Sequence, residues 1–208
     1  MYKLNPLPYD YDALEPFIDT HTLGLHYNKH QYSYLNNLNK LLNKNNYNFK
    51  YDIEELQLYL NNFKKEDIGE LLYNLGGVLN HASYFRSMSP TKTKPCNKLQ
   101  EQLNKSFGSI ESFKNTFKES ALNIKGSGYT FLVINQNQKL QIINLQNQDS
   151  PYFYNLLPLL TLDMWEHAYY INYENRKAEY IDNFLEILDF SFANNIYNRK
   201  KALFWTSQ

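Results

Sequence analysis

The stretch Asp163-Met164-Trp165-Glu166-His167-Ala168-Tyr169-Tyr170 carries the strongest structural signal in this chain. Asp163 and His167 are four residues apart. A carboxylate oxygen and an imidazole nitrogen at this spacing can converge on one point, either on one helical face or at a strand-to-helix corner. Apolar residues flank the pair, and a buried carboxylate beside a buried imidazole needs compensation. A first-row transition metal supplies it, because such ions accept both ligand types, and an internal ion pair is the alternative.

Histidine is rare in the chain and is regularly placed. The five histidines are His21, His26, His30, His81 and His167. His26 and His30 are again four residues apart, whereas His81 follows Gly76 and Gly77 in a helical pattern. Each helical glycine costs up to about 1 kcal/mol relative to alanine, so we expect something to pack closely against the backbone there. Taken alone, His81 is equally well explained as a core histidine bonded to a neighbour.

Composition limits the classes of protein to consider. A chain of 208 residues can form one sizeable domain or two small lobes around a shared core. Lys+Arg and Asp+Glu both number 21, and this balance argues against a nucleic-acid or membrane-surface binder. The single cysteine, Cys96, cannot form an internal disulfide, which fits a reducing compartment. The sequence has no apolar N-terminal segment of the kind found in signal peptides, and it has no run of 18 apolar residues that would predict a transmembrane helix.

Apolar periodicity predicts a helical first half. Residues 16 to about 42 and 65 to about 87 carry helical stripes, and 51–62 suggests a short helix or turn between them. The segment Ser89–Pro95 contains two prolines and little apolar character, so it is the best linker candidate. We therefore expect two lobes, residues 1–89 and residues 90–208.

The second half changes character. Ser109 is placed to cap a helix that runs to about Ile124. The β-rich runs 129–134 and 140–145 predict a hairpin, 156–162 a third strand, and 180 to about 197 a terminal helix. The predicted class is α+β: an N-terminal helical hairpin lobe, then a C-terminal lobe with a small three-stranded antiparallel sheet and helices.

Over nearly its full length, the chain resembles the iron/manganese superoxide dismutase family. The Asp163-to-Tyr170 motif is highly specific, and the order and spacing of the other motifs agree with it. These other motifs are Leu7-Pro8-Tyr9, His26-Tyr27-Asn28-Lys29-His30, Gly76-Gly77-x-x-Asn80-His81, and Asn147-Gln148-Asp149-Ser150-Pro151.

The resemblance implies one Mn or Fe ion per chain, held by His26, His81, Asp163 and His167. It also implies an enzyme that converts superoxide to dioxygen and hydrogen peroxide by alternate reduction and oxidation of that ion. Zinc could not replace the ion, because it has no accessible second oxidation state.

The same resemblance assigns roles around the ion. His30 and Tyr34 would line the substrate funnel, Gln148 would hydrogen-bond a metal-bound solvent molecule, and Trp165 would wall the pocket. Glu166 and Tyr170 would reach across a two-fold interface, to His167 of the partner subunit and His30 of the partner subunit respectively. A homodimer is therefore expected, or a tetramer built of such dimers. Met1 directly before the family-like start favours a cytoplasmic protein.

The metal preference indicated by the sequence is mixed. Gly77 together with Gln148 resembles the manganese pattern, in which Gly77 leaves room for the glutamine, whereas Thr161 is more typical of iron-type members. We favour manganese, with use of either metal as the alternative. Aromatic residues of other kinds stand where the family usually has tryptophan. They are Phe85, Tyr129, Phe131 and Phe190.

Three rival interpretations stay open at this point. A mononuclear iron oxygenase uses two histidines and one carboxylate, but this chain offers a fourth ligand. A non-catalytic metal-binding protein could have kept the fold, although Tyr34, His30 and Gln148 accompany the ligands. A helical adaptor without metal would leave the spacing of the histidines unexplained.

Overall fold

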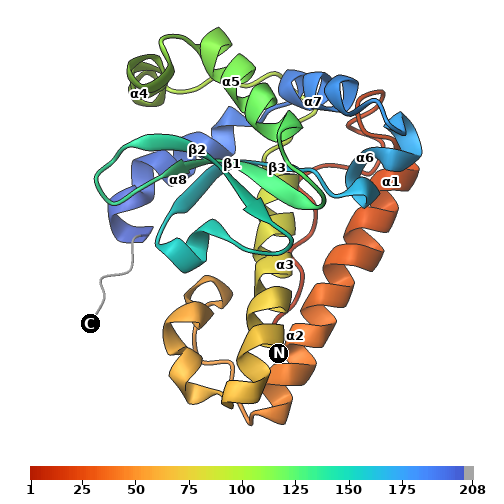
Figure 1. Ribbon diagram of the computed structural model, residues 1–208, viewed down its shortest axis with the longest axis vertical. Coiled ribbons are helices and arrows are strands. Elements are labelled where there is room, and N and C mark those ends of the chain that lie inside the picture. Colours follow the sequence, from red (N-terminus) through yellow and green to blue (C-terminus); the bar gives the residue numbers. More distant parts are fainter. Residues whose placement is uncertain (204–208) are drawn as a thin grey trace.

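The computed structural model describes the backbone of residues 1–203 and the side chains of residues 1–199 (Figure 1). The helices of the first half are α1 (Thr20–Leu25), the π-helical η1 (His26–Gln31), α2 (Tyr32–Lys44), the 3₁₀ helices η2 (Ile53–Asn62) and η3 (Lys65–Asp67), and α3 (Ile68–Arg86). The second half contains α4 (Asn97–Phe107), α5 (Ile110–Leu122), η4 (Pro151–Tyr154), α6 (Glu166–Tyr173), α7 (Lys177–Glu186), α8 (Phe190–Leu203), and the strands β1 (Gly128–Ile134), β2 (Leu140–Gln146) and β3 (Leu157–Asp163).

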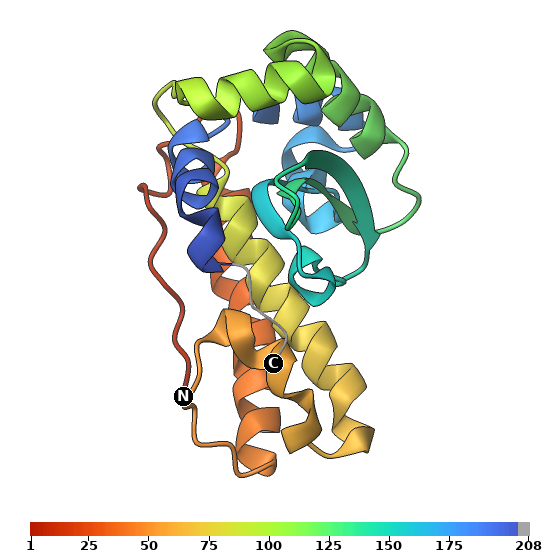
Figure 2. The same ribbon diagram turned by 90° about the vertical axis from the view of Figure 1, so that its left-hand side faces the viewer.

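A long helical hairpin forms the N-terminal half. The rod α1–η1–α2 lies beside α3, and both extend away from the sheet and its covering helices (Figures 1 and 2). Asp19 caps the rod by accepting a hydrogen bond from the backbone N–H of Thr22, at 2.8 Å. Leucines on the facing sides of α2 and α3 form a core of their own with η2. The predicted hairpin is confirmed, but it begins at Thr20 rather than at residue 16.

The first long helix, α1–η1–α2, differs from the prediction around His26 and His30. An α-helical stripe was expected through His26 and His30, but residues 26–31 form a π-helical turn between two α-helices. Single π-helical turns inside α-helices are rare and occur frequently at functional sites. The local widening therefore falls on the residues that the sequence singled out.

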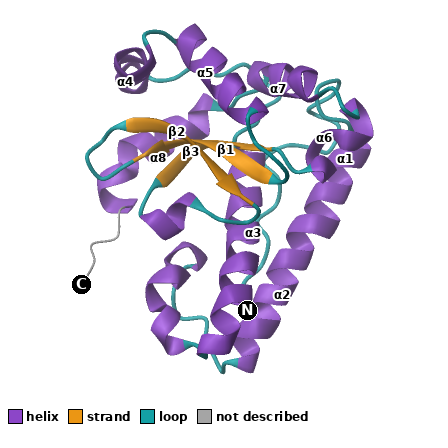
Figure 3. Cartoon of the chain, viewed as in Figure 1, coloured by secondary structure: helices purple, strands orange, loops and turns teal. Residues whose placement is uncertain are grey.

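The sheet has the order β2-β1-β3 with antiparallel pairing throughout (Figure 3). Leu132 and Ile134 pack into the main core with α5 and α7, while Tyr129, Phe131 and Val133 form a smaller cluster on the other face. In the register, Tyr129 lies opposite Asp163. The predicted three-stranded sheet is confirmed, and its third strand brings Asp163 to the helical hairpin.

The predicted terminal helix over residues 180–197 is wrong as a single element, because α7 and α8 are separate. The chain between them is held extended: Leu188 forms an isolated β-bridge with Met88, and the N–H of Asp189 donates to the carbonyl of Ser87 at 2.8 Å. This pairing with the end of α3 breaks the helix.

Two features complete the comparison with expectation. Helix α4 was not predicted, although Leu99, Leu103 and Phe107 have helical spacing along it. The lobe boundary at residues 89/90 stays a prediction, and residues 204–208 of the expected lobe 90–208 lie outside the described residues. Within the described part of the chain, no helix combines the length and apolar character needed to cross a membrane.

Candidate metal centre

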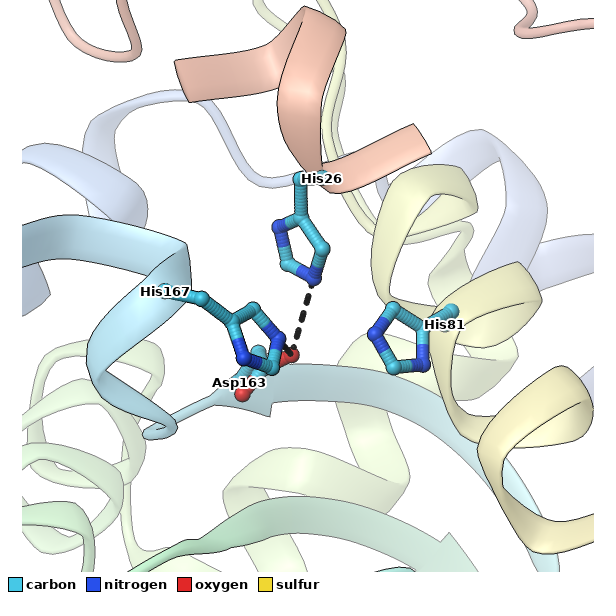
Figure 4. A group of neighbouring side chains, drawn as sticks. All are labelled: His26, His81, Asp163 and His167. Atoms are coloured by element: carbon cyan, nitrogen blue, oxygen red, sulfur yellow. Dashed lines mark ion pairs between the residues drawn. The ribbon is translucent and has the colours of Figure 1, made fainter. Parts of the chain in front are cut away.

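Four side chains converge where the hairpin meets the sheet. They are His26 from η1, His81 from α3, Asp163 from the end of β3, and His167 from α6 (Figure 4). One potential ligand atom from each lies within 4.8 Å of all the others. Three of the four are buried, and His167 is nearly so. Residues separated by most of the chain therefore form one cluster.

A strand-to-helix corner presents the two C-terminal ligands. Asp163 is the last residue of β3, and α6 begins at Glu166. Of the two arrangements that the spacing allowed, the chain therefore adopts the strand-to-helix corner and not a shared helical face. The backbone N–H of Trp165 donates to Oδ1 of Asp163 at 2.8 Å, which leaves Oδ2 facing the cluster. The hydroxyl of Tyr180 donates to the Asp163 carbonyl at 2.9 Å and holds the corner from behind.

The polar atoms facing the centre fit a metal ion. Nε2 of His26 and of His167 lie 3.2 and 3.7 Å from Oδ2 of Asp163. Neither these three atoms nor Nε2 of His81 has a hydrogen-bond partner among the described residues. Four buried polar atoms without partners are costly. Because one cation would satisfy all four, we conclude that the residues fit such an ion.

The protonation states suit the same role. Burial lowers the pKa of His26 to about 4 and that of His81 well below its ordinary value. Burial alone raises the pKa of Asp163, but the imidazoles of His167 and His26 outweigh it and hold that pKa below its ordinary value. Neutral imidazoles and an ionised carboxylate are the forms that bind metals.

Hydrogen bonding fixes the ring of His81. Its Nδ1 lies 2.6 Å from the carbonyl of Gly77, one turn earlier in α3. A carbonyl can only accept, so Nδ1 carries the hydrogen and Nε2 presents its lone pair to the cluster. This kind of outer contact orients metal-binding histidines in general.

Comparison with known proteins agrees with the geometry. The model of the alpha-hairpin domain of iron/manganese superoxide dismutases matches residues 1–89, and the model of their C-terminal domain matches residues 95–196. The chain belongs to the iron/manganese superoxide dismutase family. The cluster of His26, His81, Asp163 and His167 is the site for one Mn or Fe ion in this family member.

Two relatives extend the match over most of the chain. A protein of Buchnera aphidicola subsp. Acyrthosiphon pisum (strain APS), named as a manganese superoxide dismutase, is 40% identical over 200 residues, which is 93% of this chain and 97% of the relative. A second protein so named, from Leptolyngbya boryana, is 37% identical over 198 residues, 94% of this chain and 80% of its own length.

A hydrogen-bonded chain lies beside the ligands of this dismutase-family site. The Tyr129 hydroxyl donates to Oε1 of Gln148 at 3.0 Å, and Nε2 of Gln148 donates to the Tyr34 hydroxyl, also at 3.0 Å. Gln148 and Tyr129 are buried, and Tyr34 is half-buried. Since the Gln148 oxygen is occupied by Tyr129, its amide nitrogen is the group that faces Tyr34.

The two glycines of α3 make room for this chain. A Cβ atom on Gly76 would lie 1.8 Å from the backbone carbonyl oxygen of Gln148, and one on Gly77 would lie 2.4 Å from the Tyr34 ring. The expected close approach to the helix backbone is confirmed. The expectation that Gly77 makes room for Gln148 needs correction, because the Tyr34 ring fills that space and Gly76 is the residue against Gln148.

The other residues singled out by sequence lie at the outer edge of the site. The ring of His30 stacks on the ring of His167, with the centroids 4.0 Å apart, and the centroids of the Trp165 and His167 rings are 5.5 Å apart. Glu166 and Tyr170 are exposed on α6. His21 is exposed and does not belong to the cluster.

The positions that usually carry tryptophan remain filled by buried aromatic rings. Phe85, Tyr129, Phe131 and Phe190 are all at most 5% exposed. Phe85 lies 5.0 Å from the His26 ring, between ring centroids. The bond from Tyr129 to Gln148 was not predicted. The signal was present, because a buried tyrosine hydroxyl beside an expected glutamine needs a partner.

Proposed function

We propose that this protein is a superoxide dismutase that converts superoxide to dioxygen and hydrogen peroxide, with one Mn or Fe ion per chain. The observation that carries the proposal is the buried cluster of three histidines and one aspartate beside the chain Tyr129–Gln148–Tyr34. When bound, the ion supplies one-electron chemistry, accepting an electron from one superoxide and returning it to a second.

The residues of this chain hold the ion and supply protons. His26, His81, His167 and Asp163 would be its ligands. Two superoxide anions become one dioxygen and one hydrogen peroxide only when two protons are added, so a proton path is required. The Tyr34 hydroxyl is the half-buried end of a hydrogen-bonded chain, and burial raises its pKa. At neutral pH it is protonated and available as a donor.

His30 and Trp165 would shape the approach to the ion. The pKa of His30 is lowered by burial and by His167, so its ring is neutral at pH 7 and does not repel the cationic site. Trp165 is fixed by donation from Nε1 to the carbonyl of Asn147, at 3.1 Å. The rings of His30 and Trp165 both pack near His167, with centroid distances of 4.0 and 5.5 Å, so they would form part of the wall around this ligand.

We favour manganese because the amide of Gln148 is well anchored and nothing from α3 competes with it. Tyr129 holds the amide oxygen, and a side chain at Gly77 would meet Tyr34. Thr161, the iron-like residue, is buried, and its hydroxyl group is hydrogen-bonded to that of Ser83 at 2.6 Å.

Separate reconstitution with Mn and with Fe tests the function and the metal preference together. We expect one ion per chain in each preparation, superoxide consumption by the Mn form at least equal to that of the Fe form, and substantial activity with iron. Measurements are metal analysis and a superoxide-consumption assay on the same samples. Activity in the Fe form alone would contradict the proposed preference for manganese. If the Mn preparation and the Fe preparation both contained one ion per chain and neither consumed superoxide, the proposed dismutase activity would be wrong.

We also propose that two chains form a symmetric dimer through α6. Within residues 1–203, Glu166 has no hydrogen-bond or ion-pair partner, although it directly precedes His167. Tyr170 and Ile171 are 51% and 52% exposed on the same helix. An unpartnered carboxylate beside two exposed apolar residues fits an interface with a second copy.

Replacing Glu166 with alanine should weaken dimerisation and activity together, because the carboxylate would lose its contact with His167 of the partner subunit. Sedimentation velocity and the dismutase assay would be run over the same range of protein concentration. Glu101→Ala, at an exposed position on α4, is the matched control and should change neither. A fully active monomeric wild-type protein at assay concentration would disprove the dimer proposal.

A further inference from the structure

A small pocket lies between the N-terminal segment and the helical hairpin. Residues 1–7 form neither helix nor strand and run beside the hairpin (Figure 2). The side chain of Asn39 fixes this segment through two hydrogen bonds to the backbone of Tyr2, at 3.1 and 3.0 Å. The Tyr27 hydroxyl donates to the carbonyl of Asn5 at 2.8 Å. The segment, η1, η2 and α3 together line a pocket of about 90 Å³.

This pocket is apolar over much of its wall and is separate from the metal centre. Leu4 and Leu7 of the N-terminal segment line it together with Leu79 of α3. Phe85 also lines it, and the centroid of the Phe85 ring is 5.0 Å from that of the His26 ring. None of the four metal ligands is among the described residues that line the pocket. The pocket and the centre therefore share a neighbour but no functional group.

A buried amide without a partner lines the pocket. Gln31 is the last residue of η1 and is only 4% exposed. Its Oε1 has no hydrogen-bond partner within the part of the chain that the structure describes. Leaving a buried amide oxygen without a donor is costly. A hydrogen-bond donor held in the pocket would satisfy this oxygen.

Two opposite charges line the same pocket without pairing. They are the carboxylate of Glu54, from η2, and the guanidinium of Arg86, at the end of α3, and both residues are half-buried. Among the described residues, neither has an ion pair or a hydrogen bond. The Arg86 guanidinium lies over the Phe192 ring, 5.6 Å from its centroid, and such stacking leaves the N–H groups in its plane available. The pocket thus lacks an acceptor for Arg86 and a donor for Glu54.

We propose that this pocket binds a small α-amino acid, of the size of glycine or alanine, as its zwitterion. The carboxylate of the ligand pairs with Arg86, and its ammonium group donates to Glu54 and to Oε1 of Gln31. A simple carboxylate would leave Glu54 and Gln31 without a donor, and a simple amine would leave Arg86 without an acceptor. A volume of about 90 Å³ has room for about three water molecules, which suits a ligand of about five or six non-hydrogen atoms. This inference does not rest on the proposed dismutase function.

Equilibrium dialysis of the Mn-loaded protein against isotopically labelled glycine tests the proposal. We expect one glycine per chain with a dissociation constant on the order of 1 mM, which is within the affinity that about five non-hydrogen atoms can provide. Unlabelled acetate carries the carboxylate alone, and methylamine carries the ammonium group alone. Each should displace the labelled glycine at least about tenfold less well than unlabelled glycine does, because each leaves one charged partner unsatisfied.

Three variants locate the bound glycine. Arg86→Gln and Glu54→Gln each remove one charge, and either should weaken binding about tenfold or more, the equivalent of one hydrogen bond to a charged group. Gln31→Met removes the amide and should weaken binding about fivefold. The control is Lys105→Gln, which removes an exposed cation that does not line the pocket and should bind as the wild type does. Circular dichroism and metal content are measured on every sample, and the two charge variants decide the result if Gln31→Met does not fold.

Three outcomes would overturn the proposal. The first is wild-type protein that retains no glycine at tens of millimolar. The second is acetate or methylamine that displaces the label as well as glycine itself. The third is glycine bound equally by the wild type, Arg86→Gln and Glu54→Gln, which would place it elsewhere, the metal ion included. No measurement uses superoxide, so a protein without dismutase activity would defeat the proposed function and leave this test intact.

Discussion

His167→Ala should give a folded protein with little bound metal and no measurable dismutase activity. The substitution removes one of four ligand atoms and also the ring on which His30 stacks. It leaves Asp163, which is fully buried, with one imidazole fewer to balance its charge. Loss of a ligand exceeds the roughly 10- to 100-fold loss typical when only an outer partner of a ligand is removed. Metal analysis, activity and circular dichroism on one preparation would measure it.

The matched control is His21→Ala, which removes an exposed histidine outside the cluster. It should keep full metal content and full activity, so that any general effect of losing a histidine is excluded. A His167→Ala protein that is active and carries one ion per chain would contradict the assignment of the metal site.

Gly76→Ala should destabilise the protein severely and reduce its activity. The new methyl group would meet the backbone carbonyl oxygen of Gln148 at 1.8 Å, and backbone cannot move aside as a flexible side chain can. Overpacking a core typically costs about 1–3 kcal/mol, and this contact is closer than usual, so we expect at least the upper part of that range. Any relief would push Gln148 away from Tyr34. Thermal unfolding and activity of the Mn-loaded protein would measure both effects.

The opposite result is expected at Gly69, in the same helix. Nothing lies within 4 Å of a Cβ atom there, and the position is exposed. Gly69→Ala should therefore leave activity unchanged and stabilise the helix by up to about 1 kcal/mol. Equal melting temperatures for the Gly76→Ala and wild-type proteins would show that α3 and the segment around Gln148 are not packed as described.

Local sequence signals predicted most of the fold. The helical stripes, the cap at Ser109 and the β-rich runs all correspond to elements, because each depends on neighbours in the chain. The Ser109 hydroxyl accepts from the N–H of Ser112 at 2.9 Å, as its position indicated. The break between α7 and α8 could not be predicted in this way. It has no glycine or proline, and it is imposed by pairing of Leu188 with Met88, a contact between distant segments.

The metal site likewise has features that the sequence predicted and features that it could not predict. The four ligands were expected from the family resemblance, and their convergence is confirmed. The π-helical turn at His26 was not expected, since a spacing of four residues is compatible with α- and π-helical turns alike. The placement of Tyr129 and of Tyr34 also depends on three-dimensional packing. One strand register brings Tyr129 opposite Asp163, and the absence of a side chain at Gly77 lets the Tyr34 ring pack against α3.

The division of the ligands between the two halves of the chain links metal supply to the lifetime of the protein. His26 and His81 come from the segment that matches the hairpin model, and Asp163 and His167 come from the other segment. A cation shared by both segments fastens them together, and binding at a thousand times the dissociation constant adds about 4 kcal/mol to the free energy of unfolding. A cell starved of the metal would therefore hold a looser chain with an unbalanced buried carboxylate, one more open to proteases. Scarcity would lower the amount of enzyme as well as the activity of each molecule.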